Sequence, residues 1–241
     1  MPSVRVGCLV FVAVGGALGC GDNIVPSTPS ACTGDTVFSG VVRAFSTDLP
    51  FEAFPRLAGT EVCNADRPDL PCVTTDDQGQ YELACFGTGD VLLSFSHPGF
   101  VRSMWLRVAI GVPEHLDATL LTVQQNADFY APVGAVFPHP GFGTVAINDT
   151  THLDGIAFSA TGASGPFYSA DGIRLDPAAT GTIGDGVVFF IAPVGTLEIE
   201  IAPPNAAASC GEVYGGFLST GHGFTVPVFE ATEAGVYVKC R

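Results

Sequence analysis

Short segments in which apolar and polar residues alternate recur along this chain, and turns containing glycine or proline separate them. Such alternation is typical of β-strands, and few segments carry the 3.6-residue period of an amphipathic helix. In the first half, strands are predicted at residues 36–45, 59–63, 80–86, 91–97, 101–110 and 116–123. Strands at this spacing predict an all-β protein built as an antiparallel β-sandwich.

The second half repeats the pattern more loosely. Strands are predicted there at residues 143–147, 155–158, 185–190 and 195–201. Leu197, Ile199 and Ile201 alternate with glutamates, which predicts one buried and one solvated face. We therefore predict a β-sandwich over residues 36–124 and a second over 125–241, with the boundary near Gln124–Asn126. The second sandwich is either a degenerate repeat of the first or an unrelated fold of the same class.

The N-terminus has the features of an export signal. An apolar stretch from Val6 to Leu18 is shorter than the roughly 20 residues that a membrane-spanning helix needs. It leads into Ala17-Leu18-Gly19-Cys20, which resembles the lipobox of bacterial lipoproteins. The resemblance implies a signal peptide over residues 1–19, a lipid on Cys20 and a solvated tether over residues 20–35. Glycine after the cysteine favours the outer membrane, and the alternative is a periplasmic or secreted chain without a lipid.

The cysteine count fits an oxidising compartment. Of eight cysteines, Cys8 lies in the signal peptide and Cys20 carries the lipid, which leaves an even set of six. Because the sequence alone does not choose among the possible pairings, we rank them by proximity within each predicted module. The predicted pairs are Cys63–Cys72, Cys32–Cys85 and Cys210–Cys240. No Cys-x-x-Cys or cysteine–histidine cluster occurs, so no metal site is predicted.

One turn carries the most specific motif of the chain. It runs Thr74-Thr75-Asp76-Asp77-Gln78-Gly79-Gln80-Tyr81, preceded by Gly40-Val41-Val42 and followed by Gly99-Phe100. Residues 37–123 thereby resemble the carboxypeptidase regulatory-like module, a transthyretin-like β-sandwich, and depart from it at the insert between Cys63 and Cys72. The turn itself has a physical explanation: an aspartate side chain binds backbone amides and a glycine adopts positive φ. The signature residues are Thr75, Asp76, Gly79 and Tyr81, and we expect Tyr81 to face the core.

Proteins of this family often carry the module beside a zinc peptidase, so we looked for catalytic motifs. No histidine is followed by glutamate at the required spacing, and neither a Gly-x-Ser-x-Gly elbow nor a phosphate-binding loop with lysine occurs. His115 with Asp117 and His152 with Asp154 stand two residues apart, so that each pair would share a strand face. We interpret both as surface polar residues; the alternative is an enzyme with an unrecognised site. No catalytic residue and no cofactor is predicted.

Two further features of the sequence bear on ligand binding. Acidic turns at Asp76-Asp77 and Asp171-Gly172 lack the spacing of an EF-hand, so they are interpreted as ordinary turns rather than calcium sites. Trp105, the single tryptophan, is predicted to pack in the core or beside Arg107 on a strand face. A carbohydrate-binding surface would need several exposed aromatic rings.

The charge balance excludes one class of partner. The net charge is −15 and Lys239 is the only lysine, so neither nucleic-acid binding nor a polybasic membrane patch is predicted. The predicted function is that of a non-catalytic lipoprotein of the cell envelope that presents β-sandwich modules as a spacer or docking surface. Its partners would be the membrane, through the lipid anchor, and an envelope protein or glycan. The alternatives are a glycan- or peptide-binding surface module and the enzyme named above.

Overall fold

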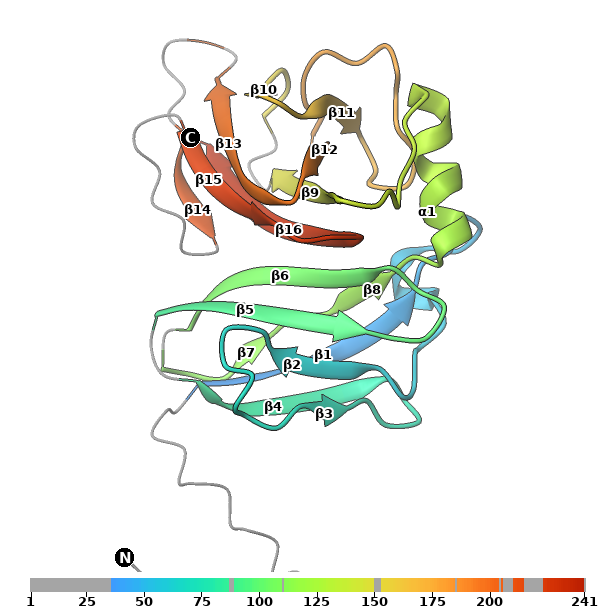
Figure 1. The fold of residues 1–241 in the computed structure, drawn as a ribbon, viewed down its shortest axis with the longest axis vertical. Helices are drawn as coiled ribbons and strands as arrows, with labels where there is room; N and C mark the ends of the chain where they lie inside the picture. Colours follow the sequence, from blue (N-terminus) through green and yellow to red (C-terminus); the bar gives the residue numbers. More distant parts are fainter. Residues whose placement is uncertain are drawn as a thin grey trace, which may run out of the picture. The chain divides into compact units, whose positions relative to one another are not determined.

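A computed structural model describes residues 36–86, 89–109, 111–149, 153–184, 186–203, 205, 210–214 and 223–240 (Figure 1). The predicted signal peptide, the lipidated Cys20 and the tether lie outside these residues. Within them, no helix has the length and hydropathy of a membrane span.

The first half consists of eight strands and one turn of 3₁₀ helix. The strands are β1 Thr36–Ala44, β2 Glu61–Asn64, β3 Val73–Thr74, β4 Gln80–Phe86, β5 Gly89–Ser96, β6 Arg102–Ala109, β7 Glu114–His115 and β8 Ala118–Leu120. The turn is η1, Phe51–Ala53. The predicted strand at 116–123 is therefore shorter than expected, because the chain turns into a helix at its end.

The second half begins with helix α1, Val123–Tyr130, and the 3₁₀ turn η2, Ala131–Val133. Its strands are β9 Phe142–Asp149, β10 Ala157–Ala160, β11 Ser164–Ser169, β12 Val187–Pro193, β13 Gly195–Ala202, β14 Cys210–Tyr214, β15 Gly223–Val228 and β16 Thr232–Cys240. The predicted boundary at Gln124–Asn126 falls inside α1.

The sequence analysis did not predict helix α1, and it also missed the strands β11, β14, β15 and β16. Thr122 caps the helix: its hydroxyl accepts from the Gln125 N–H, and the Gln125 side chain accepts from the Thr122 N–H. This reciprocal pair is a capping box, and the Thr-x-x-Gln spacing was its signal in the sequence. With only eight residues the helix shows too few turns for a clear apolar period.

The described strands form three sheets. A four-stranded sheet holds β4, β1, β7 and β8, and a three-stranded sheet holds β10, β13 and β15. The third has nine strands, in the order β11-β12-β9-β16-β6-β5-β2-β3 with β14 also paired to β16. The predicted β-rich, sandwich-like class is confirmed.

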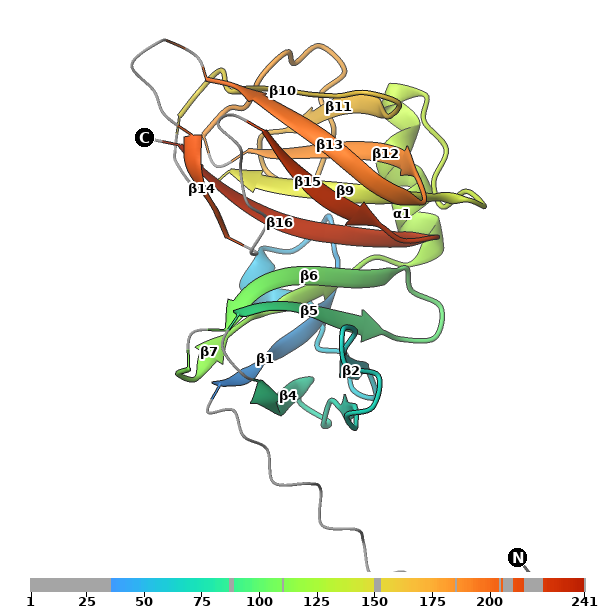
Figure 2. The same cartoon turned by 60° about the vertical axis from the view of Figure 1, so that its left-hand side comes forward.

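The expectation of purely antiparallel pairing is wrong at β16. This strand pairs in parallel with β9 over Glu233–Val238 and with β6 over Thr232–Gly235 (Figure 2). Parallel pairing needs a long connection between the strands, and more than 120 residues separate β6 from β16. Strand β16 thus joins strands of both halves into one sheet. Short parallel contacts also link β1 to β7 and β8.

The two faces of the nine-stranded sheet are covered differently. On one face, Val145, Val236 and Leu106 belong to a core cluster shared with the β10-β13-β15 sheet. The opposite face is covered in two separate pieces. The β4-β1-β7-β8 sheet covers β5 and β2 around Phe38 and Phe95, and α1 with η2 covers β9 and β12. The strip of the face between these two covers is the part that remains accessible.

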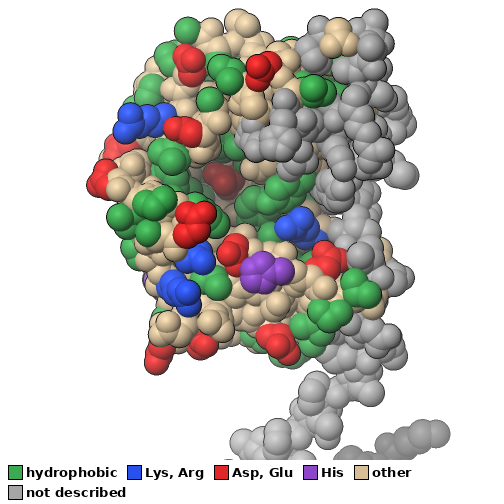
Figure 3. All heavy atoms as spheres, turned by 180° about the vertical axis from the view of Figure 1, so that it is seen from behind, with side chains coloured by type: hydrophobic (Ala, Val, Ile, Leu, Met, Phe, Trp, Pro, Cys, Tyr) green, Lys and Arg blue, Asp and Glu red, His purple; other side chains and the backbone are tan. Residues whose placement is uncertain are grey.

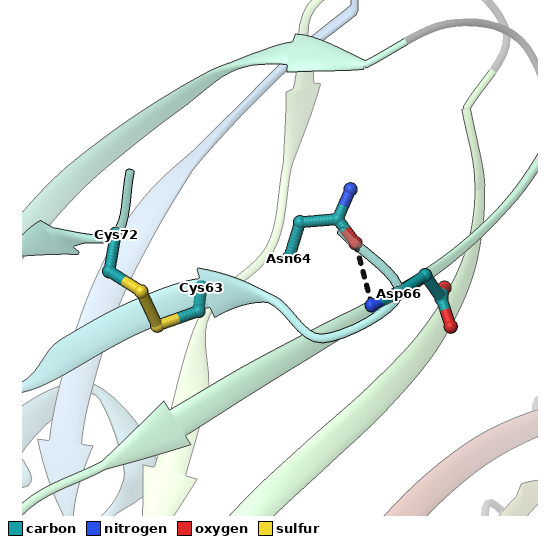
Figure 4. Close-up of a disulfide and its surroundings, with 4 residues drawn as sticks. All are labelled: Cys63, Asn64, Asp66 and Cys72. Carbon is teal, nitrogen blue, oxygen red and sulfur yellow. Dashed lines mark hydrogen bonds between the residues drawn. A yellow bond between two sulfur atoms is a disulfide. The ribbon is translucent and has the colours of Figure 1, made fainter. Parts of the chain in front are cut away.

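Two cysteine pairs can be followed in the described residues. Cys63 and Cys72 form a disulfide with Cα atoms 4.4 Å apart, the pair predicted from the sequence (Figure 4). Beside it, the Asn64 side chain accepts from the Asp66 N–H at 3.0 Å. Cys210 is also disulfide-bonded, and it lies opposite Cys240 in the β14–β16 ladder. The third predicted pair, Cys32–Cys85, has Cys32 outside the described residues and stays a prediction.

Candidate functional site

The signature turn forms the connection into β4. The Asp76 carboxylate accepts from the N–H groups of Gln78 and Gln80, both at 2.8 Å, and Gly79 has a φ of 67°. Thr75 is buried, and its hydroxyl donates to the Leu57 carbonyl at 2.7 Å. These bonds use the polar groups of the turn within the fold, so the turn positions β4 and offers little to a ligand.

Tyr81 follows the turn and points into the first-half core. Its hydroxyl donates to the Leu116 carbonyl at 2.7 Å, and its ring packs edge-on against Phe95. A Cβ atom on Gly40 would overlap that same Leu116 carbonyl. Two residues of the motif, Gly40 and Tyr81, therefore meet at one backbone group that precedes β8.

The histidine–aspartate pairs have structural surroundings. His115 Nε2 lies 3.0 Å from the Asp117 carboxylate, and His115 is exposed. The same carboxylate accepts from the Val41 N–H at 2.8 Å and faces Arg43 at 3.7 Å. Asp154 accepts from the Gly184 N–H at 2.7 Å, and its predicted partner His152 lies outside the described residues. Both pairs were interpreted as surface polar residues, and in the structure both aspartates also bind backbone amides, which gives them a part in holding the fold.

The accessible strip between the two covers is a pocket of about 320 Å³. Its floor consists of β6, β16, β9 and β12, and its walls come from the η1 segment, the loop before β8, α1 and residues 171–173. Figure 3 shows a hollow lined by hydrophobic side chains, with an acidic side chain at depth. The pocket exists because the sheet carries two covers on one face, and each cover ends before it reaches the other.

Aromatic rings form the centre of the floor. Trp105 and Tyr237 have ring centroids 5.4 Å apart with planes inclined by 31°, and the Arg107 guanidinium lies 4.7 Å from the Tyr237 centroid. Trp105 is in register with Gly235, and a Cβ on that glycine would stand 2.7 Å from the indole ring. The missing side chain of Gly235 is thus what allows the indole to lie flat on the strand.

Phenylalanines and polar groups share the walls. Phe45, Phe54 and Phe129 are nearly buried, whereas Phe51 is 45% exposed at the mouth. The polar wall residues are Asp117, Thr119, Asn148 and Asp171. Burial alone would raise the pKa of Asp171. The N–H groups of Ile173 and Arg174 and the Ser169 hydroxyl outweigh this effect and lower that pKa, so Asp171 is a carboxylate at neutral pH.

Glu233 lies at the inner end of the pocket. The side chain is half-buried because the pocket reaches it, and the burial raises the pKa of its carboxyl from 4.5 to about 7. In the described part of the chain, no donor or cation pairs with this carboxyl, so nothing offsets the burial. An ionisable group with a raised pKa in a pocket is a recognised indicator of a functional site.

The sequence analysis named Trp105, Asp117 and Asp171, which line this pocket, without assigning them to a common site. Trp105 was predicted to pack in the core or beside Arg107 on a strand face. The indole does pack against the first-half core, and its other side lines the pocket. The signal for Glu233 and Tyr237 was present: within β16 they alternate with Ala234, Val236 and Val238. The sequence alone does not show that β16 lies beside β6.

Comparisons with known proteins give distant structural similarities alone. No protein-family model matches the chain, and neither does any curated protein. A cohesin–X-dockerin complex of Acetivibrio cellulolyticus aligns at 16% identity with a TM-score of 0.28. That alignment covers 36% of this chain and 58% of the other, so this chain spans less than two thirds of it.

Two other solved structures align over most of both chains. The minor pilin GBS52 of Streptococcus agalactiae gives 10% identity and a TM-score of 0.26, with 85% of this chain and 95% of the other covered. A putative carbohydrate binding protein of Bacteroides uniformis gives 10% and 0.27, with 81% and 98% covered. Structural similarity at this level does not identify a function.

Proposed function

We propose that this chain is an exported, non-catalytic module that binds a sugar ring in the aromatic pocket. The observation that carries the proposal is the Trp105–Tyr237 pair on the pocket floor. Flat aromatic rings pack against the apolar face of a pyranose, and polar groups around them bind its hydroxyls. Asp117, Asn148 and Asp171 offer such groups.

The size and shape of the site support the same function. A pocket of about 320 Å³ lies at the lower end of the range of small-ligand sites, about 300–1,000 Å³. The first function predicted from the sequence is that of a spacer. A spacer would need neither the aromatic floor of this pocket nor the unpaired carboxyl of Glu233. We therefore favour the glycan-binding alternative over the spacer.

Binding is expected to depend on the Tyr237 ring. The variant Tyr237→Ala should bind sugar at least about fivefold more weakly, because a stacked ring contributes about 1 kcal/mol or more. Tyr237→Phe keeps the ring and should stay within about threefold of the parent. Trp105 is the single tryptophan of the chain, so its fluorescence reports binding at the floor directly.

The test titrates the purified chain with glucose, galactose and their amino and N-acetylamino derivatives, after a wider glycan array has been screened. A change in Trp105 fluorescence that saturates and weakens in Tyr237→Ala supports the proposal. Equal affinities for Tyr237→Ala and Tyr237→Phe would show that the sugar does not stack on this ring, and no glycan binding at all would remove the function.

We further propose that the module is held at the cell envelope through a lipid on Cys20, as its resemblance to a lipobox implies. The disulfides support an extracytoplasmic location. Several acyl chains on one residue would anchor it stably, since each buried CH₂ contributes about 0.8 kcal/mol. We also propose that residues 37–123 form a transthyretin-like domain, as the resemblance of their sequence implies.

Metabolic labelling with a fatty acid is expected to mark the wild-type chain and not the variant Cys20→Ser. The variant should accumulate as unprocessed precursor or in the soluble fraction. Cys32→Ser is the matched control, because it removes a nearby cysteine outside the lipobox and should leave labelling unchanged. Label that persists in Cys20→Ser would refute the anchor and leave the pocket unaffected.

A further inference from the structure

Glu233 is the middle member of a row of polar side chains that crosses three strands. In the sheet register it lies between Ser103 of β6 and Thr144 of β9. Helix α1 lies over this row with Asn126 and Tyr130, both buried. Polar side chains are rarely placed together in a core unless they bond to one another.

Here the buried groups do not satisfy one another. The Ser103 hydroxyl and both polar atoms of the Asn126 side chain are buried without a hydrogen-bond partner among the described residues. Ser103 is 3% exposed and Asn126 is 1% exposed. Together with Glu233 they line a narrow gap that is too small to hold a water molecule. The hydroxyls of Tyr130 and Thr144 lie close to each other without a hydrogen bond of good geometry.

The charged groups around Glu233 leave the end of the pocket negative. Arg43 faces Asp117, and Arg107 lies over the Tyr237 ring, a contact that does not neutralise its charge. Asp117 and Asp171 are the two carboxylates of the wall. The other titratable side chains at this end are the phenols of Tyr130 and Tyr237, which burial keeps neutral.

An unpaired carboxyl among aromatic rings suits one kind of ligand group. A protonated amine would pair with the carboxylate and lie against the faces of Trp105 and Tyr237, which attract cations. The Asn126 amide and the Ser103 hydroxyl could then donate to the carboxylate from behind. This arrangement would satisfy the groups that the fold leaves without partners.

We propose that the pocket recognises an amino sugar and that Glu233 is the counter-ion of its protonated amine. The inference rests on the proposed function, because it assumes that a sugar ring stacks on the floor. Glu233 would be the residue that sets specificity, and Ser103 and Asn126 would be positioning residues.

The experiment compares three sets of probes by Trp105 fluorescence at pH 7.5. They are glucose and galactose, their 2-amino and 6-amino derivatives, and the N-acetylated forms of these amines. We expect at least one amino sugar to bind at least tenfold more tightly than both its hydroxyl and its N-acetyl counterparts. The variant Glu233→Gln should lose this preference and keep the weaker binding of neutral sugars. Glu198→Gln, on the exposed face of β13 and outside the pocket, is the matched control and should keep it.

A pH series separates the protein from the ligand. Acidification from pH 7.5 to 5.5 can only add protons to the ligand amine, which by itself would strengthen its binding, but it also protonates Glu233. The preference for the amine should therefore fall about tenfold or more in the parent. In Glu233→Gln it should not change.

Equal binding of amino and neutral sugars would overturn this inference and leave the sugar site standing. A preference that survives in Glu233→Gln would overturn it as well. Failure of every sugar to change the Trp105 fluorescence would instead reject the proposed function itself.

Discussion

The free energy of unfolding is expected to fall as the pH rises from about 4.5 to 7, and Glu233 is the reason. Its pKa is 4.5 in an unfolded chain and about 7 in the folded one, so the folded chain holds this proton more tightly. Stability from this group is complete below pH 4.5 and is lost as the pH passes through 7. The difference between the two pKa values corresponds to up to about 3 kcal/mol.

Denaturation in urea at pH 4.5, 5.5, 7 and 8 measures this effect as the difference between the parent and Glu233→Gln. The amide cannot ionise, so the variant should be more stable than the parent at pH 8 by up to about 3 kcal/mol and should approach it at pH 4.5. Glu198→Gln, on the exposed face of β13, is the matched control and should follow the parent. Parallel curves for the parent and Glu233→Gln would show that the carboxyl is not buried.

Gly40→Ala is expected to lower the free energy of unfolding by at least about 3 kcal/mol. The new Cβ would overlap the carbonyl of Leu116, which is backbone and already accepts from the Tyr81 hydroxyl. Relief would require β1 to move away from the segment before β8, and that movement would break the Tyr81 hydrogen bond. Forcing an atom into a packed core ordinarily costs about 1–3 kcal/mol, and here the obstacle is not a side chain that can rotate.

The measurement is again denaturation in urea. Circular dichroism follows the whole chain, and Trp105 fluorescence follows the region around β6. Ser39→Ala places the same residue one position earlier in β1, where the side chain is half-buried, and it should change the stability by less than about 1 kcal/mol. A loss of similar size in both variants would mean that alanine itself, and not the overlap with Leu116, disturbs the strand.

Local features of the structure were predictable from the sequence because local chemistry determines them. The turn at Asp76 and Gly79 follows from side-chain capping and positive φ, and alternation located β4, β6 and β13 closely. The Cys63–Cys72 disulfide closes a short insert, so proximity along the chain was a sufficient guide.

The pocket was not predictable in the same way, because distant segments build it. Trp105, Tyr237 and Phe129 come from a strand of the first half, the last described strand and the helix. No local sequence pattern indicates that β16 pairs with β6, because the alternation of apolar and polar residues in a strand does not identify the strand beside it. The sequence analysis located many of the strands and turns but not β16, and the site depends on which strands lie side by side.

The position of β16 also has a consequence for how the molecule is assembled. This strand follows every other described strand in the sequence, yet it fills a place between β9 and β6. Until it arrives, both of these strands present unpaired backbone groups, which readily capture a strand from another chain. A product shortened by residues 232–240 would expose both of these edges and is expected to self-associate.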